Sequence, residues 1–252
     1  MTEEPLPGGN MTGGVVRVGD TVRRPAGPWT PAVHALLDHL RAVGFRGAPR
    51  AHGLDDQGRE VLDFVPGTVP YDERFGLLDP DDRLHRVGRL IRDFHDAVSD
   101  FAPPPDARWQ SLVPTDGDEI IAHHDLAPWN LVVGDRWTFI DWDVAGPGTR
   151  MGDLAYAMHG FVPLTPSTDP ERAGHRVRVL ADAYGASPEE RRDLLGRLEP
   201  RTRVMHDFLR DQAALRNLPW LRQWQEGHGD VWRRDADYIA AHENIWRAAL
   251  RA

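Results

Sequence analysis

Cysteine is absent from the 252 residues of this chain. Without a thiol, the chain has no disulfide, no thiolate metal site and no cysteine nucleophile. Lysine is absent as well, because all 30 basic residues are arginine. Any side-chain cation that binds phosphate here must therefore be an arginine, whose planar fork differs in shape and reach from the point charge of lysine.

Long apolar runs are also missing. No segment approaches the roughly 18 consecutive apolar residues of a membrane-spanning helix, and the acidic start, Met-Thr-Glu-Glu-Pro-Leu-Pro, lacks the apolar core of an export signal. We therefore expect a cytoplasmic protein that does not enter a membrane. The net charge of −9 and the pI of about 5.7 argue against nucleic acid as a partner.

The most informative stretch runs from Ile121 to Asp143. It contains the sequence His-His-Asp-Leu-Ala-Pro-Trp-Asn, then two short apolar runs around a Gly-Asp turn, then Ile-Asp-Trp-Asp. The two runs predict a β-hairpin that follows a loop. Asp125 and Asn130 lie on the loop and Asp141 follows the second run, so an amide oxygen and two carboxylates could share one small volume.

Hard oxygen ligands of this kind suit Mg²⁺, which takes one or two carboxylates and completes its shell with water and phosphate oxygens. The alternative interpretation is that Asp125 and Asn130 only form side-chain turns, and that Asp141 and Asp143 are solvated acids at a strand end.

The order His-x-Asp-x4-Asn, hairpin, Asp resembles the catalytic loop and metal-binding aspartate of the protein-kinase-like phosphotransferases. Its wording is most similar to the aminoglycoside phosphotransferase and choline kinase branch, which phosphorylates small molecules. The resemblance implies an α+β, two-lobed fold. A small antiparallel-sheet lobe with one helix would cover residues 1–67, and a mainly helical lobe would cover residues 68–252.

The resemblance also implies roles for the residues of the motif. Asp125 would be the catalytic residue that accepts the proton of the acceptor hydroxyl or orients it, and Asn130 and Asp141 would hold Mg²⁺ on the phosphates of ATP. His123 would fix the conformation of the loop. Asp153 would cap the next helix and tie down the loop, while the role of His124 stays open.

A second hairpin is predicted near the start of the chain, from residues 15–18 and 21–24 around a Gly-Asp turn. Glycines at 8, 9, 13 and 14 precede it and would let backbone N–H groups approach a phosphate, although a flexible loop explains them equally well. Strand alternation lets only one of Arg23 and Arg24 face the nucleotide. Because a residue and then proline commonly follow the phosphate-binding lysine of the family, we favour Arg23.

The family pairs that lysine with a glutamate on the following helix. Here that helix is expected to begin at Thr30 as its cap and to end at Gly44, and the matching position holds His34, which we interpret as a half-buried histidine without a catalytic role. The segment 60–65 resembles the strand that joins the lobes, where the Asp63 carbonyl and the Val65 N–H would bind the adenine edge. An edge strand ending in Pro-Gly is the alternative.

The remaining sequence predicts helices. Their expected spans are Asp79–Val98, Glu171–Tyr184, a helix that starts at the capping box Ser187–Glu190 and is broken at Pro200, Arg201–Arg216 and Asp230–Leu250. We interpret the aromatic pair Trp220 and Trp224 as core residues, since helical spacing of aromatic side chains is usually a packing feature.

Taken together, these features predict an ATP- and Mg²⁺-dependent phosphotransferase that acts on a hydroxyl group of a small molecule. An aminoglycoside-like antibiotic, which would make the protein a resistance enzyme, or a hydroxylated metabolite is expected as the acceptor. We expect a monomer or weak homodimer. The alternative is a catalytically impaired kinase-like protein that binds a nucleotide, peptide or toxin in an immunity or regulatory role, an interpretation favoured by the missing lysine and helix glutamate.

Overall fold

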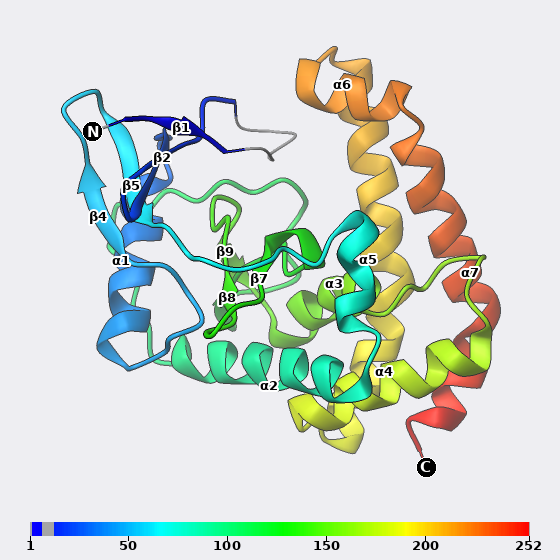
Figure 1. Ribbon diagram of the computed structural model, residues 1–252. Coiled ribbons are helices and arrows are strands. Elements are labelled where there is room, and N and C mark those ends of the chain that lie inside the picture. Colours follow the sequence, from blue (N-terminus) through cyan, green and yellow to red (C-terminus); the bar gives the residue numbers. More distant parts are fainter. Residues whose placement is uncertain (1, 7–12, 252) are drawn as a thin grey trace.

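The computed structural model describes residues 2–6 and 13–251, and within them a small antiparallel sheet lies beside a larger, mainly helical part (Figure 1). The sheet has the strand order β1-β2-β3-β5-β4. Its strands are β1 (Glu4–Pro5), β2 (Val16–Val18), β3 (Thr21–Pro25), β4 (Ala51–Leu54) and β5 (Arg59–Asp63). The predicted α+β arrangement and both strands of the first hairpin are confirmed.

Helix α1 (Thr30–Ala42) lies below the sheet in Figure 1 and contacts β4. Its apolar side chains recur at helical spacing, so one face is buried while the other carries polar residues. The buried face includes Val33, Leu36, Leu37 and Leu40. The predicted cap was wrong by one residue: Trp29 precedes the helix, and the Thr30 hydroxyl instead accepts a hydrogen bond from the Gly27 N–H at 2.9 Å.

The larger part places two small antiparallel pairs of strands among helices. The pairs join β6 (Ile120–Ala122) to β9 (Gly146–Gly148), and β7 (Leu131–Val132) to β8 (Thr138–Phe139). The second pair is the predicted hairpin, in which β7 begins at Leu131 as expected but ends before Val133, and β8 lacks Trp137 and Ile140 of the expected run. The helical elements are η1 (Asp72–Leu78), α2 (Asp81–Ala97), η2 (Pro128–Asn130), α3 (Arg150–Phe161), α4 (Pro170–Tyr184), α5 (Pro188–Ala214), α6 (Leu218–Gln225) and α7 (His228–Ala249).

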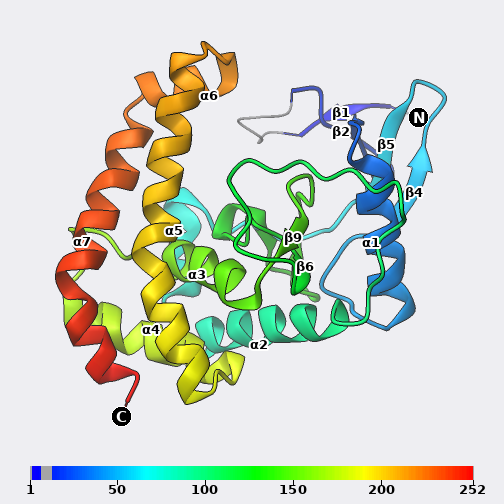
Figure 2. The ribbon, with the colours of Figure 1, turned by 180° about the vertical axis from the view of Figure 1, so that it is seen from behind.

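The helix predicted to break at Pro200 does not break. Helix α5 continues through Pro200 to Ala214, and it lies side by side with α7 in both views (Figures 1 and 2). Its start has the predicted capping box, in which Ser187 and Glu190 satisfy one another's backbone N–H groups. Helix α6, which was not predicted, contains Trp220 and Trp224.

The hairpin is buried by its neighbours. Leu131, Phe139 and Trp142 are 0–1% exposed and pack in the same apolar cluster as Phe94 of α2 and Phe161 of α3. Burial of this kind contributes roughly 25 cal/mol per Å² of apolar surface. The hairpin is therefore fixed in position, and with it the loop that precedes it and the aspartates that follow it. Over the described residues, no helix combines the length and the apolar character needed to cross a bilayer.

Candidate active site

The loop between β6 and β7 brings Asp125 and Asn130 into direct contact. The Asn130 side-chain amide donates to the Asp125 carboxylate at 2.7 Å and to its carbonyl at 3.0 Å. The other carboxylate oxygen accepts a hydrogen bond of 2.6 Å from the hydroxyl of Tyr156 on α3. Two side chains thus orient Asp125, and its remaining lone pairs are available to a hydroxyl group.

Asp141 follows β8 and is joined to the same loop through the backbone. The Ile140 N–H donates to the Asn130 carbonyl at 2.8 Å, which holds the end of the hairpin against η2. Asp141 has a φ of 61°, in the left-handed region that costs non-glycine residues energy. Such conformations persist where surrounding contacts over-determine them, and they cluster at functional sites. The structure therefore brings Asp125, Asn130 and Asp141 together, as the motif predicts.

Burial, together with the nearby charge of Asp141, raises the pKa of Asp125 to about 6, although the hydrogen bonds from Tyr156 and Asn130 act in the opposite direction. A carboxylate with such a pKa is mostly ionised at neutral pH, yet it takes up a proton more readily than an exposed aspartate does.

Asp153 on α3 fixes the start of the loop between β6 and β7. Its carboxylate accepts the backbone N–H groups of His123 at 3.0 Å and His124 at 2.8 Å, and the ring of the buried His95 lies 3.2 Å away. Burial raises the pKa of Asp153, but the hydrogen bond from His95 and the charges of the neighbouring histidines outweigh it and keep the pKa well below its usual range. The prediction that Asp153 ties down the loop is confirmed, but the cap of α3 is Thr149.

His123 fixes the loop conformation, as predicted. Its ring contacts the Ile140 carbonyl at 3.2 Å and accepts from the Asp125 N–H at 3.3 Å. Burial lowers the pKa of His123 and keeps the ring neutral. His124 has a φ of 65°, and its ring turns to the Pro147 carbonyl at 3.0 Å, so this residue supports the loop as well.

The orientation predicted for the arginine pair was wrong. Arg24, which is 7% exposed, extends to the site and donates to Glu60, to Asp141 at 2.9 Å and to Asp143. Arg23 points to the other face of the sheet, where it lies 3.6 Å from Asp55. The reason is the pleat, because consecutive side chains on a strand face opposite sides and the sheet register puts Arg24 opposite Glu60.

Glu60 supplies the glutamate that seemed to be missing. It lies on β5, is 1% exposed, and contacts both Arg24 and the ring of His34 at 2.9 Å. Burial raises the pKa of Glu60, but the hydrogen bonds from His34 and Arg24 and the charge of Arg24 lower it on balance. The carboxylate thus comes from the strand and the helix contributes a histidine. Sequence alone could not reveal this exchange without the register of β3 on β5.

The donor set fits a hard divalent cation held with few protein ligands. The Asn130 amide oxygen has no hydrogen-bond partner in the described part of the chain, and the Asp141 side chain is 44% exposed. Residues 2–6 and 13–251 contain no cluster of three or more histidine, aspartate or glutamate side chains arranged for a metal. Mg²⁺ does not need such a cluster when phosphate oxygens complete its shell.

The residues predicted to contact the nucleotide are the glycines before β2 and the backbone of Asp63 and Val65. Gly8 and Gly9 lie outside the described residues, whereas Gly14 has a φ of 83° and open space around it. The side chain of Asp63 contacts His52 at 2.7 Å, and the Val65 N–H forms no backbone hydrogen bond among the described residues. The roles of Asp63 and Val65 in adenine binding stay predictions.

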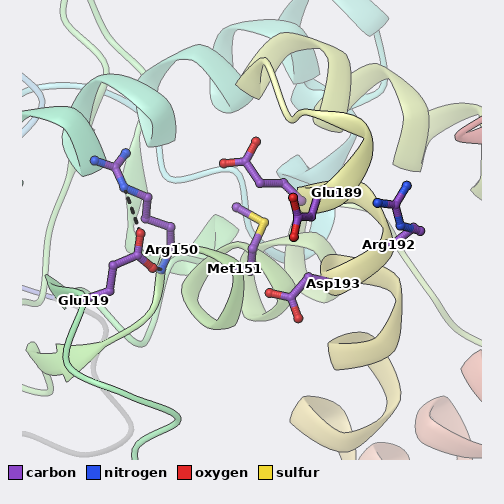
Figure 3. Close-up of a pocket in the computed structure, with 7 residues that line it drawn as sticks. Glu119, Arg150, Met151, Glu189, Arg192 and Asp193 are labelled. Carbon is purple, nitrogen blue, oxygen red and sulfur yellow. Dashed lines mark hydrogen bonds and ion pairs between the residues drawn. The ribbon is translucent and has the colours of Figure 1, made fainter.

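Two open hollows on the described surface lie away from these residues. One of about 600 Å³ is lined by charged side chains at the starts of α3 and α5, including Arg150, which lies 3.4 Å from Glu119 (Figure 3). It contains none of the predicted site residues, and its mixture of both charges provides no arrangement for chemistry. The site around Asp125 is therefore defined by its side-chain contacts.

Comparison with known proteins agrees with this geometry. The model of the phosphotransferase enzyme family matches residues 106–194, which include the whole loop and hairpin. The trifolitoxin immunity protein of Rhizobium leguminosarum bv. trifolii is 32% identical over 261 aligned residues, with 97% of each chain covered. The chain belongs to the phosphotransferase enzyme family.

Solved structures share the fold of this phosphotransferase-family protein at low sequence identity. A choline/ethanolamine kinase family protein from Mesorhizobium loti matches with a TM-score of 0.63 and 17% identity, covering 100% of this chain and 92% of the other. The GDP complex of aminoglycoside 2′-phosphotransferase-IIIa matches with a TM-score of 0.63 and 14% identity over 94% and 93% of the two chains. The predicted protein-kinase-like fold is thereby confirmed.

Three side chains of the site escaped the sequence prediction in this family member. Glu60 contacts Arg24, Tyr156 donates to Asp125, and Arg201 of α5 donates to the His124 carbonyl at 3.2 Å. Tyr156 offered a weak signal, since it follows Asp153 within one turn of the same helix. Glu60 and Arg201 offered none, because their positions depend on strand register and on the uninterrupted course of α5.

Proposed function

We propose that this protein is an ATP- and Mg²⁺-dependent phosphotransferase that phosphorylates a hydroxyl group of a small molecule. The observation that carries the proposal is the assembly of Asp125, Asn130 and Asp141 at one place, held by Asp153 from behind. Phosphoryl transfer needs positioned reactants and neutralised charge more than covalent chemistry from the protein. Asp125 would position the acceptor, while Mg²⁺ held by Asn130 and Asp141 and the guanidinium of Arg24 would neutralise the phosphates.

In the proposed reaction, the acceptor oxygen forms a bond to the γ-phosphorus as the bond from that phosphorus to the bridging oxygen breaks, and ADP leaves. The proton of the hydroxyl passes to Asp125, which Tyr156 and Asn130 keep oriented. Such a base contributes roughly 10²–10⁴-fold to the rate. Asn130 and Asp141 would hold Mg²⁺, which neutralises charge on the phosphates when bound.

The cation proposed to bind the α- and β-phosphates is Arg24, not Arg23. Its guanidinium lies beside Asp141 and is held by Glu60, as the family's lysine is held by a glutamate. The carboxylates around it outweigh the effect of burial and raise its pKa, so it stays charged at every physiological pH. The backbone of Asp63 and Val65 is proposed to contact the adenine edge.

Calorimetric titration of Mg²⁺ and ATP into the protein tests this function, with Asp141→Ala as the variant that should lose the Mg²⁺-dependent part of binding. A screen of ATP consumption over hydroxylated compounds follows, with Asp125→Asn as the inactive control. ATP that binds and is never consumed with any acceptor would contradict the enzyme assignment.

A second candidate is a kinase-like binding protein with an immunity role. The specific observation in its favour is the 32% identity to a relative named as a toxin immunity protein. Arg24 is also engaged by three carboxylates, and a phosphate would have to compete with them. If the protein protects cells from a toxin only by binding, substitution of Asp125 would leave that protection unchanged. If it acts as a phosphotransferase, the same substitution should abolish the protection.

A further inference from the structure

Arg201 of α5 lies beside the proposed base with its hydrogen bonding incomplete. One terminal nitrogen, Nη2, donates to the His124 carbonyl at 3.2 Å, and the guanidinium carbon lies 4.5 Å from the centre of the Tyr156 ring. Tyr156 in turn donates to Asp125. The other terminal nitrogen, Nη1, is buried and has no partner among the described residues.

An unpaired, buried guanidinium N–H is unfavourable, because it has lost its water without gaining an acceptor. Arg201 as a whole is half-buried, and its guanidinium is buried beside the His124 carbonyl and the Tyr156 ring. The arrangement is that of a donor whose acceptor arrives with a ligand. Its distance from Asp125, bridged by the single side chain of Tyr156, places such a ligand on the acceptor side of the proposed reaction.

The surroundings of Tyr156 are apolar and aromatic. The half-buried side chains that pack against it and its neighbours are Val113, Trp129, Phe208 and Trp232. The Trp232 ring stacks on Tyr156 with centroids 6.2 Å apart. The nearby acid Asp235 is already engaged by His159 at 3.0 Å. This surface therefore provides ring faces and a cationic donor with one unused terminal nitrogen, whereas a polycationic aminoglycoside would need free carboxylates in addition to the proposed base.

We propose that the acceptor is an anionic hydroxyl compound: a molecule with an apolar or aromatic body whose carboxylate binds Arg201 while its hydroxyl faces Asp125. The proposal rests on the proposed phosphotransferase function and specifies its acceptor class. A charge-assisted hydrogen bond to a guanidinium is stronger than a neutral one. The same guanidinium repels polycationic acceptors, so it would favour anionic compounds and disfavour aminoglycosides.

Binding of matched acids and amides tests the proposal directly. The probes are 3-phenyllactate, N-benzoylserine and N-benzoylthreonine, each compared by calorimetry with its primary amide, and kanamycin as the polycation. Loss of a charge-assisted hydrogen bond weakens binding by roughly ten-fold or more. We expect at least one acid to bind the wild-type protein about ten-fold tighter than its amide, and tighter than kanamycin.

The variants Arg201→Ala and Arg201→Lys identify the responsible group. Alanine should abolish the preference for the acid, and lysine should retain part of it, since the charge stays but the fork is lost. The matched control is Arg203→Ala on the same helix, where the arginine pairs with Glu199 and Asp237 away from the site. Arg203→Ala should keep the full preference.

Several outcomes would overturn the proposal: no binding by any acid, equal binding of acids and amides, tighter binding of kanamycin, or a preference that survives Arg201→Ala. Equal binding would indicate that a water molecule satisfies Nη1 instead. An ATP titration on the same samples separates the two proposals. If the wild-type protein does not bind ATP, the phosphotransferase function is refuted. If it binds ATP but shows no preference for the acids, only the acceptor class is refuted.

Discussion

A single guanidinium, that of Arg24, joins three carboxylates that come from two parts of the chain. Glu60 lies on the neighbouring strand of the sheet, and Asp141 and Asp143 follow the hairpin of the helical part. The desolvation of buried charges is costly unless each is paired, and here every nitrogen type of the guanidinium has an acceptor. The residue thus acts both as a structural link and as the proposed phosphate ligand.

Glu60→Gln should weaken this link. The neutral amide keeps the size of the side chain but removes one charge from a buried pair, so we expect the free energy of unfolding to fall by roughly 1–3 kcal/mol. Urea denaturation measures the change. The matched control is Asp55→Asn, whose carboxylate pairs with Arg23 and Arg59 on the outer face of the sheet. Equal effects of the two changes would contradict the role assigned to Glu60.

Asp153→Asn should produce a stability loss that depends on pH. The native environment keeps the pKa of Asp153 far below the ordinary value of 3.8, so its contribution is complete above about pH 4 and is lost as the pH falls toward the lower native pKa. We expect a loss of roughly 3 kcal/mol at pH 7. Denaturation at a series of pH values should show the difference from wild type shrinking below about pH 4. A difference independent of pH would argue against an ionised Asp153 in the native state.

At the scale of elements, the sequence predicted most of the framework. Both hairpins, the first helix and the helices around 81–97, 170–184 and 228–249 follow from apolar periodicity and glycine turns, and the start of α5 follows from its capping box, all of which are local signals. The motif likewise predicted Asp125, Asn130 and Asp141. The choice of Arg23 over Arg24 was wrong because it depends on the register of β3 on β5, which places Arg24 opposite Glu60. Strand register is a tertiary property that the local sequence does not determine.

Pro200 was the misleading local signal. A proline inside a helix removes one backbone hydrogen bond and crowds the carbonyl four residues earlier. That residue is Gly196, which is exposed and has open space around it, so the backbone there can adjust. The packing of α5 against α3 and α7 outweighs the local cost, and the helix continues to Arg201 and beyond.

Pro200→Ala should therefore stabilise the protein. The alanine restores a backbone donor and removes the crowding, and part of this gain is cancelled by the greater freedom of the unfolded chain. We expect the free energy of unfolding to rise by roughly 1–2 kcal/mol. The matched control is Pro188→Ala at the first turn of the same helix, where proline is well tolerated and no gain is expected. Equal stabilisation by both substitutions would contradict the assignment of the gain to the helix interior around Pro200.

At the scale of the whole molecule, the sheet and the helical part meet at few but specific contacts. The segment after β5 approaches the hairpin turn so closely that a Cβ on Gly67 would lie 2.6 Å from the Val132 side chain, and one on Gly134 would lie 2.5 Å from the Pro66 carbonyl. Thr68 pairs with Val133 through two backbone hydrogen bonds of 2.8 Å. The boundary predicted at residue 67 falls within this junction and stays a prediction.

Arg24→Ala should loosen the sheet without disturbing the distant helices. Loss of the arginine leaves Glu60, Asp141 and Asp143 without their shared cation, so local opening of the sheet becomes easier. We expect amide hydrogen exchange in β3 and β5 to accelerate by about ten-fold or more, with α4 and α7 unchanged. Arg23→Ala, on the opposite face, should accelerate it far less. Uniform acceleration over the chain would instead indicate a general loss of stability.

The replacement of lysine by arginine also affects how this protein would be detected in a proteome. Acyl-phosphate reagents mark nucleotide-binding proteins by acylating a side-chain amine near the phosphates, and this chain offers none. A proteome survey with these reagents would not detect this protein, even when its proposed nucleotide site is occupied. Dicarbonyl reagents modify guanidinium groups, but they would reach Arg24 only when its hydrogen bonds to Glu60, Asp141 and Asp143 are broken. The rate at which Arg24 is modified would therefore report how often the sheet separates from the two aspartates.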